Sequence, residues 1–375
     1  MIYLDSAATS LLKPSSVAAA MSAAIKGCAS PGRGAYAAAA RAADIALACR
    51  EEAAAFFHVN EPERVVFTMN ATHGLNIAIR SLVGPGMRVL ISGYEHNAVT
   101  RPLRAMGAKV LVAAAAPFDR CGMLAAFRRL LPQAELVVCT HVSNVFGFIL
   151  PIEEIAAMCR AAAVPLIVDA AQSAGVLPLD FESLGCAFLA CPGHKGLMGP
   201  QGTGLLLCRG EAKPLLIGGT GSASAEETMP DFYPDRLEAG TQNIPGVAGL
   251  LEGLRWVKAA GTDEISRLER HMSDIFASTL AGVPGLRVFH ADDPVLQSGV
   301  LSVQHAVLDA EAAAEKLGER GIAVRAGLHC APLAHKTAGT LERGTLRFSF
   351  SPLLKPASVR EAAAVTAEIF MAAVS

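Results

Sequence analysis

The most informative stretch of the chain is PLIVDAAQSAGVLPLDFESLGCAFLACPGHKGLMGPQGTGLLLC, residues 165–208. Its first residues, 165–168, form a short apolar run led by proline, which is typical of a buried strand that delivers Asp169 at its carboxyl end. Gln172 follows in the next loop. A second apolar run ends in CPGHKG, so Lys195 also lies just past a strand end. In an open parallel sheet these ends share one crevice, where ligands bind.

The pairing of an acid with a lysine suggests a cofactor. An aspartate that ends an apolar strand is costly to bury unless a cationic or hydrogen-bonding group receives it. Pyridoxal phosphate supplies such a group, because a lysine forms a Schiff base with it and an acid holds its ring nitrogen protonated. Lys195 and Asp169 suit these two roles. The alternative is that Asp169 caps a loop and Lys195 lies on the surface.

Composition limits the classes of function. The 375 residues suit about two domains, with ample apolar content for a core. A net charge of -2, a pI near 6.6 and few aromatic residues argue against a nucleic-acid partner. The first residues lack a signal-peptide pattern, and later segments are too interrupted to span a bilayer. We therefore expect a soluble, cytoplasmic protein with a small-molecule partner and no membrane association.

The nine cysteines form no CxxC pair, and most lie inside apolar runs. This pattern predicts small buried hydrophobic residues in a reducing compartment, rather than a disulfide framework or a metal site. Cys330 differs, because it lies outside any apolar strand.

The N-terminal part predicts helices at 15–24 and 35–57, followed by a strand at 64–69. This strand turns through NATHG into a helix at 75–82. Free backbone N–H groups at a helix start bind anions, so the turn is a candidate site for the cofactor phosphate. An ordinary capped helix start is the alternative.

From residue 88 the chain alternates strand and helix. We expect strands at 88–92, 109–115 and 135–141, and helices at 98–106, 123–131 and 152–163. This rhythm predicts a mostly parallel sheet with helices on both faces. Polar groups follow two of these strands, in YEHN and HVSN. His96 is either a plain loop histidine or a proton-moving group on the cofactor face, and Asn144 either caps its turn or points into the crevice.

A flexible, polar stretch, GGTGSAS at 218–224, leads into an irregular segment ending in RLEAGTQN at 243. It matches no dinucleotide or P-loop fingerprint, and such a long loop is more often a functional arm. Helices at 246–260 and 264–281 lead into a second unit, and we expect the domain boundary near 246–261. That unit has predicted strands at 286–289, 299–305, 323–325 and 345–350, and helices at 311–319 and 357–373.

The second unit carries two chemically notable residues. Cys330, in VRAGLHCAPL, follows an arginine and a histidine that favour the thiolate, the reactive form of cysteine. It is either catalytic or an incidental loop thiol. Arg347 lies inside an apolar strand with no acidic neighbour in sequence, where an unpaired guanidinium is costly. It is either half of a buried salt bridge or the group that binds the α-carboxylate of an amino-acid substrate.

Taken together, these motifs resemble the class V aminotransferase-like group of pyridoxal-phosphate enzymes, and within it the cysteine desulfurases, including the branch that overlaps with selenocysteine lyases. The resemblance runs through LDSAATS, NATHGLN, EHNA, HVSNVFG, VDAAQSAG, GHK, EAGTQN and RAGLHCAPL. It implies the α/β fold of type I pyridoxal-phosphate-dependent transferases. A large domain, 13–250, would hold the mostly parallel sheet, and a smaller C-terminal α/β domain, 251–375, would carry Cys330 and Arg347, with residues 1–12 as a candidate to pack on it.

The same resemblance implies roles for individual residues. Lys195 would form the Schiff base and move the Cα proton, Cys330 would be the nucleophile, and His96 would stack on the ring. Cofactor binding would involve Ala71, Thr72, His96, Asn144, Asp169, Gln172, His194, Lys195 and Thr241, the last reaching across from the second subunit of a homodimer. Asn144 and Arg347 would bind the substrate carboxylate.

The implied reaction converts L-cysteine to L-alanine and leaves a persulfide on Cys330 for transfer to an acceptor protein. The alternatives are a selenocysteine lyase, a class V aminotransferase or β-lyase in which Cys330 is incidental, and a degenerate sulfur-carrier scaffold without enzyme activity. Two positions depart from the family pattern. Pro192 replaces a serine that contacts the phosphate in many relatives, and Leu328 replaces a histidine of one branch.

Overall fold

The computed structural model describes residues 1–31 and 34–373. Its largest sheet has seven strands in the order β2 (Val65–Thr68), β8 (Gly204–Cys208), β7 (Phe188–Pro192), β6 (Leu166–Asp169), β5 (Leu136–Thr140), β3 (Arg88–Ser92) and β4 (Lys109–Ala113). β8 is antiparallel to both of its neighbours, and the five strands from β7 to β4 pair in parallel. The predicted mostly parallel sheet is therefore confirmed. The reversed strand β8 was not anticipated as a strand.

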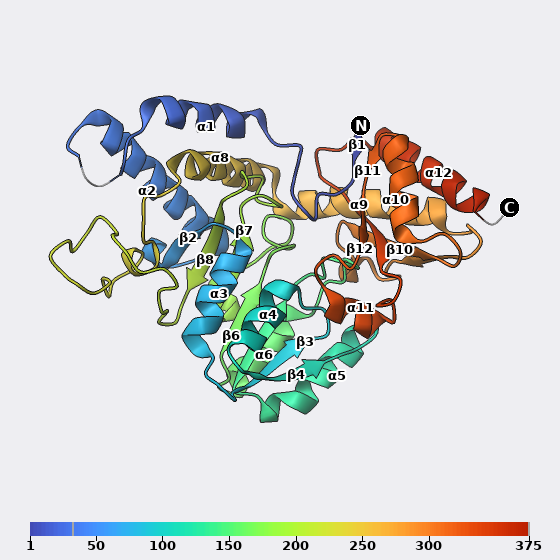
Figure 1. Cartoon of the computed structure of the whole chain (residues 1–375), viewed down its shortest axis with the longest axis horizontal. Coiled ribbons are helices and arrows are strands. Elements are labelled where there is room, and N and C mark those ends of the chain that lie inside the picture. The colour runs from blue at the N-terminus through green and yellow to red at the C-terminus, as the bar shows by residue number, and fades with distance from the viewer. Residues whose placement is uncertain (32–33, 374–375) are drawn as a thin grey trace.

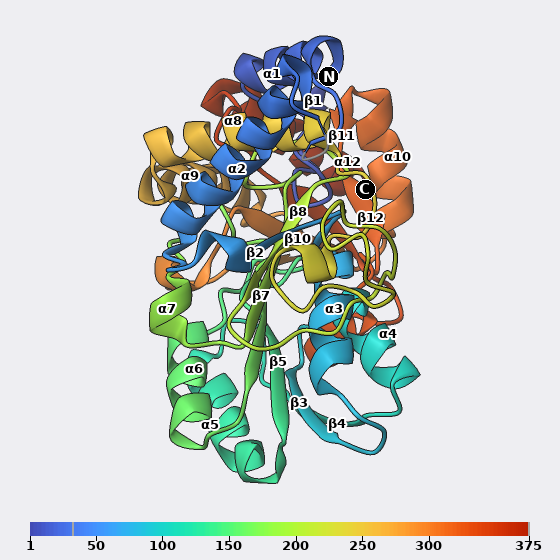
Figure 2. The same ribbon diagram turned by 90° about the vertical axis from the view of Figure 1, so that its left-hand side faces the viewer.

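Helices cover both faces of this sheet (Figure 2). One face holds α3 (Ala71–Leu82) and α4 (Asn97–Ala105), which pack on alternate residues of the central strands. The other face holds α2 (Ala37–Phe57), α5 (Arg120–Leu130), α6 (Ile152–Ala161), α7 (Phe181–Leu184) and α8 (Ile244–Ala260). α1 (Ser15–Gly27) lies outside, against α8. Strands covered on both sides need continuous apolar sequences, which explains runs such as LIVD and FLAC.

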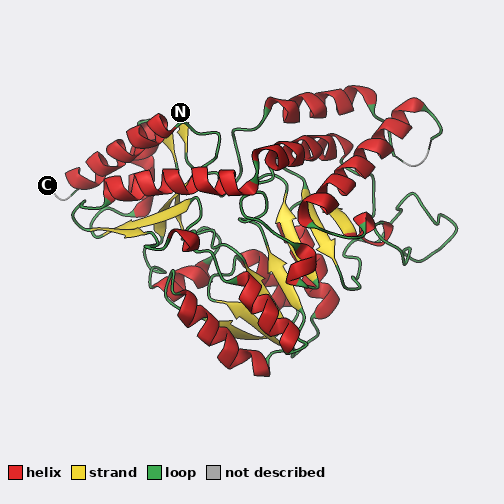
Figure 3. Cartoon of the chain, turned by 180° about the vertical axis from the view of Figure 1, so that it is seen from behind, coloured by secondary structure: helices red, strands yellow, loops and turns green. Residues whose placement is uncertain are grey.

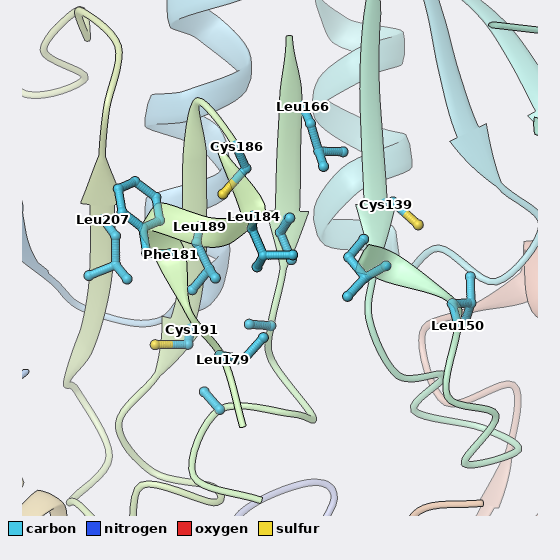
Figure 4. Close-up of a cluster of buried hydrophobic side chains, with 14 of the residues drawn as sticks. Cys139, Leu150, Leu166, Leu179, Phe181, Leu184, Cys186, Leu189, Cys191 and Leu207 are labelled. Atoms are coloured by element: carbon cyan, nitrogen blue, oxygen red, sulfur yellow. The ribbon is translucent and has the colours of Figure 1, made fainter. Parts of the chain in front are cut away.

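Figure 4 shows part of the core on the second of these faces, where Leu166, Leu189 and Leu207 of β6, β7 and β8 belong to one cluster with Phe181 and Leu184 of α7. Burial at this density stabilises the fold by about 1.5–3 kcal/mol for each large apolar side chain. Cys139, Cys186 and Cys191 belong to the same cluster. They are free, buried thiols, as predicted for most of the cysteines.

The smaller sheet is antiparallel, with the order β12 (Arg325–Gly327), β13 (Thr345–Ser349), β10 (Val300–His305) and β9 (Leu286–Phe289). Its core is closed by α9 (Thr262–Leu280), α10 (Ala310–Glu319) and α12 (Pro356–Ala372). The strand expected at 323–325 is instead two short strands, β11 (Ile322–Ala323) and β12, with a break at Val324. The short helix α11 (Pro332–Ala338), directly after Cys330, was not predicted.

The N-terminus lies with the C-terminal elements (Figure 1). β1 (Ile2–Tyr3) pairs in parallel with β11, and Asp5 forms a bridge with Ser349. α8 runs without a break from residue 244 to 260, so a division of the chain at residue 250 falls inside a helix. Part of the segment between β8 and α8 loops out from the body of the molecule (Figures 1 and 3), while Leu237 and Glu238 near its end are buried.

The remaining elements are short 3-10 turns at Pro62–Arg64, Leu131–Gln133, Asp235–Leu237 and Pro294–Leu296. Among the described residues, 1–31 and 34–373, the model contains no helix with the length and apolar character needed to cross a membrane.

Candidate active site

A cavity of about 180 Å³ lies at the carboxyl ends of β3, β5, β6 and β7. This is the edge of a parallel sheet at which ligands bind. Residues of the smaller sheet close the other side of the cavity. The lining contains every residue predicted for the site except Thr241, namely Ala71, Thr72, His96, Asn144, Asp169, Gln172, His194, Lys195, Cys330 and Arg347.

Asp169, the last residue of β6, is buried, and its Oδ1 accepts a hydrogen bond from the backbone N–H of Ala171 at 2.9 Å. Burial raises the pKa of this carboxyl, against the lowering effects of the Ala171 N–H and of Lys195. Burial also lowers the pKa of Lys195 to about 8, although the Asp169 carboxylate opposes this change. The lysine therefore reaches its nucleophilic, uncharged form more easily than a solvated lysine.

Two glycines bring the loops that carry these groups into contact. Gly175, in the loop after Asp169, has a φ of +81°, and a Cβ built there would lie 2.4 Å from the carbonyl oxygen of Gly196. A Cβ at Gly196 would in turn lie 2.4 Å from the carbonyl oxygen of Ala174. Larger residues do not fit such an approach. The glycines of VDAAQSAG and GHKG therefore hold Lys195 beside the Asp169 loop.

The start of α3 forms the part of the cavity suited to an anion. Asn70 caps the helix, because its Oδ1 accepts from the N–H of His73 at 2.9 Å. The helix consequently begins at Ala71, not at residue 75 as predicted, and Ala71 and Thr72 of its first turn line the cavity. Helix N-termini bind phosphate through such N–H groups.

His194 lies beside this helix start. Its Nδ1 is 3.1 Å from the Thr9 hydroxyl, and its carbonyl accepts from the N–H of Ser10 at 2.9 Å. Burial lowers the pKa of His194 to about 4, so the ring is uncharged at neutral pH. Pro192 also lines the cavity and has no N–H to offer a phosphate.

His96 caps α4, because its Nδ1 accepts from the N–H of Ala98 at 3.0 Å. Burial, aided by the positive charge of Lys195, lowers the pKa of His96 to about 4. A ring that accepts through Nδ1 and is uncharged carries its proton on Nε2. His96 therefore presents a neutral imidazole to the cavity.

Arg347 forms a buried salt bridge and also lines the cavity, so it is compatible with both roles that the sequence left open, the structural ion pair and the binding of a substrate carboxylate. It is buried in β13, where its Nη2 donates to Asp5 Oδ1 at 2.5 Å and its Nη1 donates to the carbonyl of Asn144 at 3.0 Å. It also lines the cavity. The guanidinium has five N–H donors, so these two bonds leave donors for a carboxylate. Sequence reasoning missed Asp5, whose only signal was its place after the apolar start of the chain.

Cys330 is exposed and lies at the cavity in a strained turn. His329 and Cys330 have φ values of +48° and +56°, in the left-handed region that is unfavourable for residues with a Cβ. Both carbonyls of the turn are held. Asn144 Nδ2 donates to the carbonyl of His329 at 2.8 Å, and the N–H of Asn97 donates to that of Cys330 at 2.8 Å. The turn thus fixes the cysteine on the same cavity as Lys195.

Gln172 and Thr241 occupy different places. Gln172 lines the cavity, and its Nε2 donates to the carbonyl of Ala7 at 3.0 Å. Thr241 lines a neighbouring cavity of about 760 Å³, which also touches Asn70 and His194. Arg325 lines the main cavity together with Cys330 and was not among the predicted site residues.

The lysine, the buried carboxylate and the anion-binding helix end fit pyridoxal phosphate, and together with the α/β fold they define a pyridoxal-phosphate-dependent enzyme. The chain belongs to the aminotransferase class-V family, whose model matches residues 2–360.

Individual relatives narrow the comparison. A protein of Methanothermobacter thermautotrophicus named probable cysteine desulfurase is 34% identical over 362 residues, which cover 91% of this chain and 88% of the relative. The apo structure of cysteine desulfurase from Thermococcus onnurineus NA1 is 30% identical with a TM-score of 0.90, covering 99% of this chain and 95% of that one. The S-sulfonic acid form of cysteine desulfurase CsdA from Escherichia coli is 29% identical with a TM-score of 0.85, covering 99% and 94%. The predicted family and fold class are confirmed.

Proposed function

We propose that the protein is a cysteine desulfurase, which converts L-cysteine to L-alanine and keeps the sulfur as a persulfide on Cys330. The observation that carries this proposal is the position of Cys330 on the same cavity as Lys195 and Asp169. The names of the relatives support it. A class V aminotransferase would not need a cysteine fixed at this point by the bond from Asn97 to Cys330 and the bond from Asn144 to His329.

We propose for these residues the roles that the family resemblance implies, and their positions around one cavity support those roles. Arg347 and Asn144 would bind the substrate carboxylate, and Asp169 would hold the ring nitrogen of the cofactor. Ala71, Thr72 and His194 would bind the phosphate, while His96 would stack on the ring and Gln172 would bind its hydroxyl. Pyridoxal phosphate, when bound, withdraws electrons from the substrate Cα. Lys195 removes the Cα proton, for which its lowered pKa suits it.

Sulfur transfer is a balanced exchange of bonds at Cys330. The thiolate of Cys330 forms an S–S bond with the substrate sulfur, while the C–S bond of the substrate breaks. The electron pair of the broken bond stays with the substrate Cβ, which takes up a proton, and Lys195 returns a proton to Cα, so that the carbon product is alanine. The substrate sulfur remains on Cys330 and passes to an acceptor protein.

We further propose a homodimer in which Thr241 of one subunit completes the phosphate site of the other. The larger cavity beside Asn70 and His194 supports this, as do the exposed apolar residues Met69 and Leu216 that lie on or beside it. The domain limits 13–250 and 251–375 are likewise proposals. The pairing of β1 with β11 supports packing of residues 1–12 on the smaller domain. We propose the cytoplasm as the compartment, because all nine cysteines are free thiols.

The test of the function is to mix the protein with L-cysteine and a reductant and to measure alanine and sulfide together. We expect equal amounts of both products. Cys330→Ala should lose both while keeping the visible absorbance of bound cofactor, and Cys121→Ala, which removes the other exposed cysteine, should keep full activity. Retained desulfuration in the Cys330 variant would refute the role of this thiol.

Two further assays on the same purified protein distinguish the proposed activity from two related ones. A selenocysteine lyase would act much faster on L-selenocysteine than on L-cysteine, so the two rates should be compared at equal concentration. An aminotransferase would transfer the amino group to a keto acid, and this transfer would survive Cys330→Ala.

A further inference from the structure

Glu95 is a fully buried acid that none of the proposed catalytic steps uses. It follows β3 and has 0% of its surface exposed. Its Oε1 accepts two hydrogen bonds, from Ser92 Oγ at 2.5 Å and from the N–H of Thr140 at 2.8 Å. Its Oε2 is buried and has no hydrogen-bond partner among the described residues. An ionised carboxylate with one oxygen in this state is very costly, and the neutral acid costs much less because it brings no charge into the buried site.

The neighbours of Glu95 make it one member of a pair of carboxyls. Thr140, which donates to Glu95, is the register partner of Asp169 across β5 and β6. Burial raises the pKa of Glu95 to about 8, and the negative charge of Asp169 adds to this effect. Among the described residues, Cys139 on β5 is also close enough to Glu95 to interact with its charge, and the pKa of Cys139 is raised by burial and by Glu95.

The two acids differ in the groups that stabilise a charge. Asp169 has the amine of Lys195 nearby and an N–H from Ala171, and both favour its anionic form. The hydrogen bonds of Glu95 also favour its anion, but no cation of the described residues is among the main influences on its pKa, and burial outweighs those bonds. When two neighbouring buried carboxyls have such different surroundings, one stays protonated and the other stays ionised. Here Glu95 is the protonated acid and Asp169 the ionised one.

We propose that Glu95 is a positioning residue of the cofactor site: an uncharged carboxylic acid that ties the ends of β3 and β5 together and leaves Asp169 as the anion of the pair. Its bonds to Ser92 and Thr140 hold the turn that carries His96. The inference rests on the proposed function only in placing the cofactor beside Asp169.

The first test measures the binding of pyridoxal phosphate to the cofactor-free protein at pH 7. Glu95→Gln keeps a carbonyl acceptor for Ser92 and Thr140 and is uncharged, so its dissociation constant should stay within about twofold of the wild type. Glu95→Ala leaves the Thr140 N–H buried without a partner, and its dissociation constant should rise about tenfold or more.

The second test measures unfolding of the cofactor-free protein against pH. Because the folded pKa of Glu95 is raised from 4.5 to about 8, its protonation stabilises the fold fully below pH 4.5, and this contribution is lost as the pH rises to about 8. Between pH 4.5 and 8 the free energy of unfolding of Glu95→Gln should fall less steeply with pH than that of the wild type. The difference in slope should correspond to about one proton.

Glu269 of α9 provides the matched control, because burial also raises its pKa to about 8. Glu269→Gln should change the pH slope in the same way, while Glu269→Ala should leave pyridoxal-phosphate affinity within about twofold of the wild type.

Three outcomes would overturn the inference. A tenfold loss of affinity in Glu95→Gln, or an unchanged pH slope in that variant, would mean that Glu95 is ionised. Wild-type affinity in Glu95→Ala would mean that it positions nothing. None of these measurements uses turnover, so they stand even if the wild-type protein releases no alanine or sulfide from cysteine.

Discussion

Arg347 and Asp5 form an ion pair of 2.5 Å although they are 342 positions apart in the chain. The pair joins the segment after β1 to β13 at the wall of the cavity. It is nearly closed to solvent on the arginine side, where the side chain is 2% exposed, and less so for Asp5, at 19%. Asp5 therefore offsets the cost of burying the guanidinium that is proposed to receive the substrate carboxylate.

The first prediction concerns this pair. Asp5→Ala should lower the free energy of unfolding by about 3 kcal/mol, because it leaves a buried charge without its partner. Asp5→Asn should lose less, because its amide oxygen still accepts a hydrogen bond. Denaturant unfolding with and without L-alanine measures the effect. The product carboxylate should stabilise Asp5→Ala more than the wild type, and equal stabilisation of both would contradict the assignment of Arg347.

The second prediction concerns pH and the cofactor. Lys195 reacts with pyridoxal phosphate as the uncharged amine, and its pKa is lowered from 10.5 to about 8. The rate at which the cofactor-free protein gains visible cofactor absorbance should rise about tenfold per pH unit below 8 and level off above it. A rate that keeps rising to pH 10 would show that Lys195 titrates like a solvated lysine.

The third prediction tests the contact between the two glycine loops. Gly175→Ala should weaken pyridoxal-phosphate binding, because the new Cβ would collide with the Gly196 carbonyl and push the Lys195 loop away. Gly86→Ala is the matched control. Gly86 has a similar φ of +79°, but nothing lies within 4 Å of its Cβ position. Both variants should lose about 1–2 kcal/mol of stability from backbone strain, whereas only Gly175→Ala should lose cofactor affinity.

The fourth prediction concerns the segment that carries Thr241. Glu238 is buried and bonds Arg50 through both oxygens, at 2.9 and 3.0 Å, and also accepts from the N–H of Phe67 at 2.7 Å. Glu238→Ala should reduce the free energy of unfolding by about 3–5 kcal/mol. Glu211→Ala, which removes a carboxylate that is 68% exposed from its pair with Arg236, should cost less than about 1 kcal/mol in the same denaturant titration.

Much of the fold followed from local pattern. Short apolar runs that alternate with amphipathic segments predicted the parallel strands β3 to β7 and the helices between them, because strands covered on both faces need continuous apolar sequence. The predicted ends of some elements differ from those in the structure. α3 begins at Ala71, because Asn70 caps the helix there. Residues 71–74, ATHG, therefore belong to the helix, although their turn-like composition had predicted a turn.

The strand β8 was missed for a different reason. Its sequence, GLLLC, is apolar but follows a run of glycines, and its direction depends on a place between β2 and β7 that no local signal encodes. The short helix α11 and the split between β11 and β12 are likewise set by packing around Cys330 and the smaller sheet.

The chemistry of the site could be inferred from the chain alone, because Asp169, Lys195 and the α3 start each lie next to an element end that periodicity reveals. Their convergence on one cavity follows from the geometry of a parallel sheet. The carboxylate partner of Arg347 and the burial of Glu95 could not be inferred. They depend on β1 returning to β11 and on the β3 and β5 ends closing over one side chain, and such long-range pairings are chosen by the free energy of the whole packed fold.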